Sequence, residues 1–169
     1  LEFGQFFARI GTAVTIIQRS GHLLSHLDAD VGIALKDAFL EEGIGVFTGT
    51  SLQRVEGSGL SKRVYFHHQG REVHVDGALI LQALGRRPLI DGLRLDRAGV
   101  SVIDGGVSVD GTMRTSQAHI FAAGDVTNLY DIVHIAVQQG ELTGFNALQS
   151  AGPLRSFDSR LVTEVIFTE

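Results

Sequence analysis

The chain has 169 residues, a formal net charge of −5 and no cysteine. Its length is sufficient for a domain of ordinary size with its own core. The acidic balance argues against nucleic acid and anionic membranes as partners. No apolar run reaches the roughly 18 residues that span a bilayer, so we expect a cytoplasmic protein with no membrane partner. Without a thiolate, any redox chemistry requires a bound cofactor.

The first seventeen residues have the pattern of a helix followed by a strand. Apolar residues recur at three- and four-residue steps from Leu1 to Ile10 and predict a helix with one apolar face, which ends at Gly11. Val14–Ile17 then predicts a buried strand, and this order is typical of the second half of a βαβ unit. Because residue 1 is Leu and no cap precedes the helix, we interpret the chain as a fragment.

Gln18 and Arg19 follow this strand, where dinucleotide folds contact the adenosine ribose. An acid at that place accepts hydrogen bonds from the ribose hydroxyls of NAD, whereas an arginine pairs with the 2′-phosphate of NADP. Here Gln18 replaces the acid and Arg19 comes next. The pair therefore favours NADP, with NAD as the alternative.

The next segment contains His22, His26, Asp28 and Asp30, which could in principle bind zinc. Because these residues lie across a loop and a helix start, we predict a solvated loop and no metal. Asp28 or Asp30 is expected to cap a helix that runs to Glu42. The buried stripe of that helix is predicted to be Val31, Ile33, Ala34, Phe39 and Leu40.

Strand patterns dominate the middle of the chain. Ile44–Phe47 predicts another buried strand, and the alternating segments 51–56, 63–67 and 72–75, joined by glycine turns, predict an antiparallel three-stranded meander with one solvated face. Ala78–Ala83 is predicted to return to the parallel sheet as a strand. Gly85 and Arg86 follow it, at the sheet edge where ligands bind.

The segment Thr115–Val126 has the most informative pattern. Ile120–Ala123 predicts a buried parallel strand whose carboxyl end carries Gly124 and Asp125. A glycine allows close approach of a ligand, and a carboxylate accepts hydrogen bonds from a polyol or ribose. The alternative is a strand that ends in a tight turn with Asp125 as a cap. A helix is predicted from about Asp131 to Ala147.

The complete string Thr115–Val126 resembles the second flavin-binding signature of the class I pyridine nucleotide-disulfide oxidoreductase family, which includes glutathione reductase, dihydrolipoamide dehydrogenase and mercuric reductase. The resemblance implies that Asp125 holds the ribityl chain of FAD. Val133–Gly140 resembles the helix whose first turn meets the flavin pyrimidine, which implies that Val133 and His134 bind the cofactor. Free N–H groups there, with the helix dipole, would stabilise negative charge on reduced flavin. A packed histidine without flavin contact is the alternative for His134.

Two further segments resemble the nicotinamide end of these enzymes. Leu1–Gln5 is similar to the stretch after the nucleotide-binding glycines, which implies that Glu2 lies near the nicotinamide; the alternative is an ordinary first-turn glutamate. Gly85–Arg86 is similar to the family's glycine-arginine pair, and a basic turn after a strand is its alternative. Arg19 matches an arginine of the glutathione and mercuric reductases. The family's second arginine falls on Ser25, which leaves NAD open.

The resemblance implies an α/β fold of the FAD/NAD(P)-binding, Rossmann-like three-layer class, with a parallel sheet, helices and an antiparallel three-stranded meander, truncated at both ends. It divides the chain into part of an NAD(P)-binding domain (1–88), the carboxyl-terminal part of an FAD-binding domain (89–156) and the start of a dimerisation domain (157–169). Leu161–Phe167 is expected to be the first strand of that last domain.

The implied function is an FAD-dependent oxidoreductase that passes hydride from NAD(P)H to flavin and on to a disulfide or other small-molecule acceptor. The family resemblance also implies a role in cell redox homeostasis and a homodimer in the full-length protein. No catalytic residue is expected within these residues, and the fragment alone is expected to be inactive. The alternative is a non-catalytic nucleotide-binding or structural fragment, or a degenerate homologue.

Overall fold

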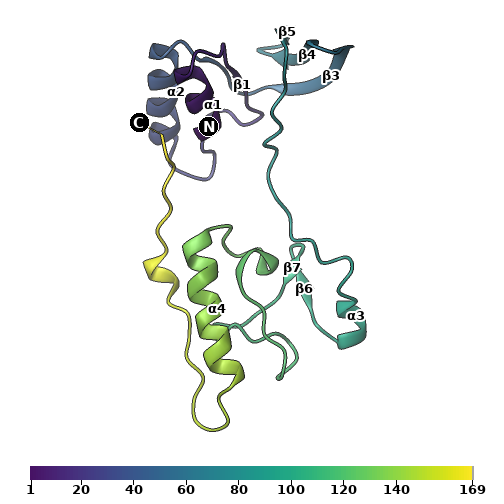
Figure 1. The fold of residues 1–169 in the computed structure, drawn as a ribbon, viewed down its shortest axis with the longest axis vertical. Coiled ribbons are helices and arrows are strands. Elements are labelled where there is room, and N and C mark those ends of the chain that lie inside the picture. The colour runs from purple at the N-terminus through teal and green to yellow at the C-terminus, as the bar shows by residue number, and fades with distance from the viewer. Residues whose placement is uncertain (169) are drawn as a thin grey trace. The chain divides into compact units, whose positions relative to one another are not determined.

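The computed structural model describes residues 1–168, which form two compact units. Unit 1 comprises Leu1–Gln82 and the end of the chain from Ile166, and unit 2 comprises Ala83–Val165. Each unit has buried apolar residues of its own. Figure 1 shows the elements of both units in chain order along its colour bar.

Unit 1 begins with two helices and a short parallel sheet. The elements are α1 (Glu2–Arg9), β1 (Thr15–Ile17), α2 (Ala29–Glu41) and β2 (Gly45–Phe47). β1 pairs with β2 in parallel, with Ile16 opposite Val46, so both predicted strands form, but their residues are exposed or only half-buried rather than buried. Buried Leu23, Phe39 and Ile44 form the core beneath this sheet and α2.

The second part of unit 1 is the predicted antiparallel meander of β3 (Ser51–Ser58), β4 (Ser61–His68) and β5 (Arg71–Gly77). On its exposed face Arg54 pairs with Glu72 at 2.9 Å, and Arg63 pairs with Asp76 at 2.6 Å. These arginine hydrogen bonds lower the pKa of Glu72 and Asp76. Because all three strands are joined by tight turns, each finds its partner within a few residues.

The helix faces of unit 1 differ from the prediction. Phe3, Phe6 and Ile10 on α1 are exposed, at 64%, 56% and 63%, whereas Gln5 is buried. The Nε2 of Gln5 donates to Glu42 at 2.7 Å, so a polar side of α1 lies against the end of α2.

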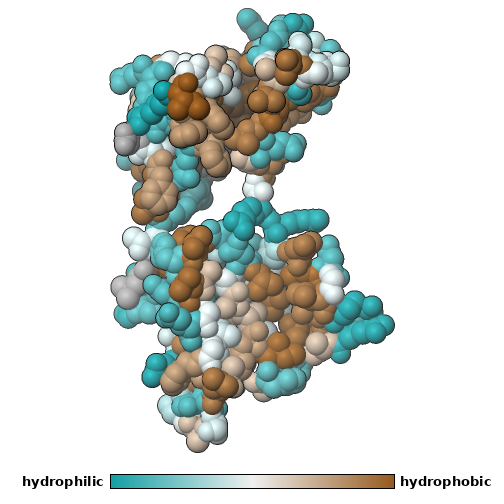
Figure 2. Space-filling model, viewed as in Figure 1, coloured by the Kyte–Doolittle hydropathy of each residue, from teal (hydrophilic) through white to brown (hydrophobic). Residues whose placement is uncertain are grey.

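The stripe predicted for α2 is also wrong in part. Phe39 is buried as predicted, but Val31, Ile33, Ala34 and Leu40 are exposed. Gly32 is buried in their place: a Cβ there would lie 2.1 Å from the carbonyl oxygen of Leu23. This close contact with the preceding loop sets which side of α2 faces the core. Figure 2 shows apolar side chains in brown on the visible surface of each unit.

The strand predicted at Ala78–Ala83 does not form. Leu79 and Leu81 are 84% and 63% exposed, and within residues 1–168 β1 pairs only with β2. A parallel strand requires a hydrogen-bonding neighbour from a distant segment. The described residues provide no such neighbour to this apolar run, so it does not form a strand.

Unit 2 consists of short elements around one long helix. They are α3 (Leu95–Ala98), the hairpin of β6 (Val102–Ile103) and β7 (Gly106–Val107), the 3-10 turn η1 (Gly124–Thr127), α4 (Val133–Ala147) and a second 3-10 turn, η2 (Ser159–Leu161). α4 matches the predicted helix. The strand predicted at Leu161–Phe167 does not form.

The segment Ile120–Ala123 is not the predicted parallel strand. Phe121 forms an isolated antiparallel bridge with Arg114, and the N–H of Ala122 donates to the carbonyl of Met113 at 3.1 Å. The loop therefore folds back on the preceding residues, and local bonds satisfy backbone groups that a parallel neighbour would otherwise satisfy.

Asn146 links distant parts of unit 2. Its buried Nδ2 donates to the carbonyls of Thr112 and Arg155, both at 2.9 Å, and its Oδ1 accepts from the N–H of Arg155 at 2.9 Å. One amide thus ties the carboxyl end of α4 to two loops. Among the helices in residues 1–168, none has the length and apolar content needed to cross a bilayer.

Candidate functional site

The Gly124–Asp125 turn connects the extended segment before it to η1. Gly124 is buried and has φ of +75°, a conformation that side-chain-bearing residues rarely adopt. A Cβ at this position would lie 3.2 Å from the Cβ of Ala136 on α4. The turn therefore requires glycine both for its backbone conformation and for its close approach to the helix.

Two buried side chains hold the peptide groups of this turn. The N–H of Gly124 donates to Oε1 of Gln139 at 2.8 Å, and the hydroxyl of Thr127 donates to the carbonyl of Gly124 at 2.8 Å. Gln139 is 0% exposed and Thr127 is 5% exposed. Because water does not compete at these buried positions, the orientation of the turn is well defined.

Asp125 meets Arg86 across a long separation in the sequence. Nη2 of Arg86 donates to Oδ2 of Asp125 at 2.5 Å, and the side chains are 71% and 38% exposed, respectively. Among residues 1–168, Arg86 is the one side chain that donates to this carboxylate, and it does so at Oδ2. An ionised carboxylate can accept further hydrogen bonds, including one from a hydroxyl group.

The amino-terminal end of α4 belongs to the same unit. Val133 is 81% exposed, His134 is exposed, and Ile132, the residue at the N-cap position, provides no side-chain hydrogen bond. The first N–H groups of a helix have no partner within the helix, and the helix dipole makes that end positive. This end of α4 can therefore interact favourably with a negatively charged group.

The other three predicted cofactor-binding residues, Glu2, Gln18 and Arg19, belong to unit 1 and lie at the ends of α1 and β1. The carbonyl of Gln18 accepts hydrogen bonds from the N–H and the hydroxyl of Thr50 at 3.2 and 3.0 Å. Arg19 is exposed. Oε1 of Glu2, in the first turn of α1, accepts from the N–H of Phe167 at 2.9 Å.

The structure thus divides the predicted site residues between the two units. Glu2, Gln18 and Arg19 belong to unit 1, and Gly85, Arg86, Gly124, Asp125, Val133 and His134 belong to unit 2. Gly85 is exposed, with φ of +99°, directly before Arg86. Among residues 1–168, no group of three or more histidines or acids could hold a metal ion.

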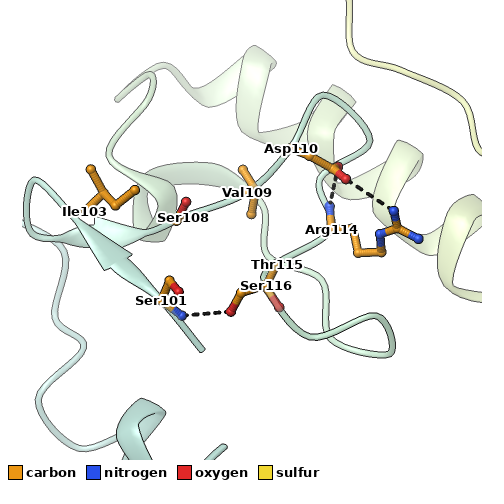
Figure 3. Close-up of a pocket in the computed structure, with 8 residues that line it drawn as sticks. All are labelled: Ser101, Ile103, Ser108, Val109, Asp110, Arg114, Thr115 and Ser116. Carbon is orange, nitrogen blue, oxygen red and sulfur yellow. Dashed lines mark hydrogen bonds and ion pairs between the residues drawn. The ribbon is translucent and has the colours of Figure 1, made fainter. Parts of the chain in front are cut away.

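A hollow of about 320 Å³ lies elsewhere in unit 2, among the residues around β6 and β7 (Figure 3). Its polar groups bond to one another: the N–H of Ser101 donates to Oγ of Ser116 at 2.9 Å, and Asp110 accepts from the N–H of Arg114 at 3.2 Å. None of the predicted cofactor-binding residues lines it. Because these groups bond to one another, we attribute them to the structure of the loop around Asp110 and not to a binding site.

Sequence analysis did not single out Gln139 and Thr127, although both hold the Gly124–Asp125 turn. Polar residues within a helix or turn are ordinarily assigned to solvent. A signal was present for Gln139, because it lies four residues after Ile135 and therefore on the same face of α4. Both side chains are buried.

Comparisons with known proteins identify the family. The family model described as pyridine nucleotide-disulphide oxidoreductase matches residues 1–140. Mercuric reductase from Staphylococcus aureus is 36% identical over 168 residues, which cover 99% of this chain and 30% of that protein. Dihydrolipoyl dehydrogenase from Bacillus subtilis is 33% identical over 146 residues, covering 86% of this chain and 31% of that protein.

A solved structure supports the same relationship. The crystal structure of LpdA from Mycobacterium tuberculosis matches with a TM-score of 0.84 and 31% identity, over 99% of this chain and 36% of that one. This match supports the α/β fold class of FAD- and NAD(P)-binding flavoproteins that the sequence predicts. The chain spans about a third of the length of these relatives.

Proposed function

Since the chain belongs to the pyridine nucleotide-disulphide oxidoreductase family, we propose that it forms part of an FAD-dependent enzyme that passes hydride from NADPH to flavin. From the flavin, electrons pass to a disulfide or another small-molecule acceptor. Its similarity to a mercuric reductase and to a dihydrolipoyl dehydrogenase supports a redox role of this kind. NADH is the alternative hydride donor.

The observation that carries the proposal is the contact between Arg86 and Asp125. The family resemblance gave each of these residues a cofactor role from a separate motif, 39 positions apart. Their 2.5 Å contact brings the two motifs together in unit 2. We assign Asp125 to the ribityl hydroxyls of FAD, because its carboxylate can accept a further hydrogen bond from a hydroxyl donor. Gly85 and Arg86 stay assigned to the nicotinamide end, as the family resemblance implies, and the contact of Arg86 with Asp125 supports a nicotinamide site next to the flavin.

The residues of unit 2 fit FAD in two further respects. Gly124 keeps the backbone beside α4 free of a side chain, since a Cβ would lie 3.2 Å from Ala136. The uncapped first turn of α4, at Val133 and His134, can stabilise negative charge on the reduced isoalloxazine. When bound, FAD supplies the hydride-accepting chemistry that a chain without cysteine lacks.

The residues of unit 1 are assigned to the nicotinamide dinucleotide. Arg19 supplies a cation for the 2′-phosphate of NADP, and Gln18 lacks the negative charge that would repel it. Glu2 is assigned to the nicotinamide end. Its Oε1 accepts the N–H of Phe167 at 2.9 Å, and an ionised carboxylate can accept further hydrogen bonds.

The domain assignment is the one that the family resemblance implies, whereas the two compact units of the structure divide after Gln82. Residues 1–88 serve as part of the NAD(P)-binding domain, 89–156 as part of the FAD-binding domain and 157–169 as the start of a dimerisation domain. We propose that the full-length protein is a homodimer in the cytoplasm. The 169 residues alone are expected to be inactive, since no Gly-x-Gly-x-x-Gly turn is present to bind a pyrophosphate at a helix terminus.

The test uses the full-length protein expressed from its gene. We expect a visible flavin spectrum and NADPH-dependent reduction of an electron-accepting dye. Added FAD should not make the isolated 169-residue polypeptide oxidise NADPH. A folded full-length protein that neither contains flavin nor takes up added FAD would contradict the proposal, and would favour a non-catalytic structural role.

A further inference from the structure

Gln139 is an unusual residue for the centre of α4 because its side chain is completely buried. Its exposure is 0%, and its Oε1 accepts the N–H of Gly124 at 2.8 Å. Its Nε2 is buried and has no hydrogen-bond partner among the described residues. The side chain therefore makes one specific hydrogen bond and leaves two donor hydrogens unpaired.

Burial of an unpaired amide costs folding free energy, and an apolar side chain of similar length would avoid that cost. The same face of α4 does accept a hydrocarbon, because Ile135, one turn earlier, is 1% exposed. Packing alone therefore does not explain an amide at residue 139. Its acceptor oxygen is what distinguishes it from an apolar residue.

That oxygen holds the N–H of Gly124, which belongs to the peptide between Ala123 and Gly124, one peptide before the one that leads into Asp125. The N–H of Gly124 is held by Gln139, its carbonyl is held by Thr127, and its α-carbon lies against Ala136. Rotation of this turn would move the Asp125 carboxylate away from Arg86. The orientation of Asp125 thus depends on residues that are themselves buried.

We propose that Gln139 is a positioning residue for FAD, an inference that rests on the flavin role assigned to Asp125 above. Gln139 is buried and acts through the Gly124 peptide, which holds the Asp125 carboxylate toward the sugar hydroxyls of the cofactor. Thr127 has the same role at the next peptide, between Gly124 and Asp125, whose carbonyl accepts its hydroxyl. Preorganised polar groups of this kind strengthen binding because the protein does not have to reorganise.

The test measures FAD dissociation constants for the full-length protein after removal of its flavin. Gln139→Met keeps the length of the side chain but removes the acceptor, and is expected to weaken FAD binding by roughly tenfold. Gln139→Glu keeps an acceptor oxygen and is expected to restore most of the affinity. Thr127→Val removes the donor to the Gly124 carbonyl and is expected to weaken binding in the same direction.

A double-mutant cycle with Asp125→Ala distinguishes positioning from packing. If Gln139 acts through Asp125, Gln139→Met should have little further effect on FAD affinity once Asp125 is replaced. Equal losses in the two backgrounds, or no loss in either, would overturn the inference. Should Gln139→Met unfold the FAD-free protein, Thr127→Val in the same cycle decides the question.

The outcomes also separate this inference from the function on which it rests. If the wild-type protein does not bind FAD, the proposed function fails. If it binds FAD and Asp125→Ala weakens binding while Gln139→Met and Thr127→Val do not, only the positioning role fails.

Discussion

The two turns that carry the main cofactor assignments are held in different ways. The Gly124–Asp125 turn is fixed by the side chains of Arg86 and Gln139 from other segments and by that of Thr127 at the end of η1. At Gln18, by contrast, the main chain itself is held: its N–H donates to the carbonyl of Phe47 at 2.8 Å, and its carbonyl accepts from Thr50. Arg19 beside it is exposed.

This difference indicates which site tolerates change. A turn fixed by several buried side chains presents a single geometry, so substitutions there should affect both folding and cofactor affinity. An exposed side chain on a backbone-held turn contributes charge with little structural role. The Gln18–Arg19 turn should therefore allow its dinucleotide preference to be exchanged without loss of the fold.

The largest effect is expected for Gly124→Val. Its positive φ and its contact with Ala136 predict a loss of roughly 2–4 kcal/mol in the free energy of unfolding, measured by chemical denaturation of the full-length protein. Gly140→Ala, in the adjacent helix α4, is the control, because a Cβ there meets nothing within 4 Å. It should stabilise by about 0.5–1 kcal/mol. Equal effects of the two substitutions would show that the turn is not constrained as described.

A smaller effect on affinity, without an effect on folding, is expected at the exposed turn. Exchange of Gln18→Glu together with Arg19→Ala removes the cation for a 2′-phosphate and restores an acid for the ribose hydroxyls. The ratio of kcat/KM for NADPH to that for NADH should fall by roughly ten- to a hundredfold, as expected for loss of charge-assisted hydrogen bonds. The unfolding temperature should remain close to that of wild type. An unchanged ratio would remove Arg19 from the NADP site.

The smallest effect is expected in the loop that lines the hollow in Figure 3. Burial acts to raise the pKa of Asp110, but hydrogen bonds from the hydroxyl and N–H of Thr112 and the N–H of Arg114 outweigh it, so the pKa is lowered. The folded carboxylate thus binds a proton less readily than the unfolded one. Its stabilising contribution is complete above the unfolded pKa of about 3.9 and is lost as the pH falls through the lowered folded value.

Asp110→Asn should therefore reduce stability near neutral pH by no more than about 1 kcal/mol, because the side chain is partly exposed to solvent. Below the lowered pKa the variant and the wild type should converge. Thr112→Val removes the hydroxyl that donates to Asp110 and should therefore raise the pKa of Asp110 in the folded protein. The loss of stability in acid should then occur at a higher pH in this variant than in wild type. Unfolding temperatures recorded across the acid range would show both changes. A constant difference between Asp110→Asn and wild type at every pH would contradict this account.

The sequence predicted those elements whose partners are close along the chain. Tight glycine turns place β3, β4 and β5 beside one another, and α4 is long enough for its period to be recognised. The apolar runs at 78–83 and 120–123 were predicted as parallel strands and are not. Their composition indicates a preference for a sheet, but it contains no information about which distant segment would pair with them.

The candidate site was predictable to a similar extent. Gly124, Asp125 and Arg86 stand in recognisable motifs, and the structure brings Arg86 and Asp125 into contact. The supporting residues Gln139 and Thr127 have no motif, and their importance follows only from burial and hydrogen bonding. The exposed phenylalanines of α1 show a different limit of prediction. The sequence pattern identifies an apolar helical face but does not indicate which segment, if any, packs against it.

The central claim is that Asp125, oriented by its neighbours, holds the sugar chain of FAD. The most direct measurement is the FAD affinity of the flavin-depleted full-length protein compared with that of its Asp125→Ala variant, followed by flavin fluorescence. We predict that wild type binds FAD and that the variant, still folded, binds it at least roughly tenfold more weakly. Equal affinity of the folded variant and wild type would contradict the account.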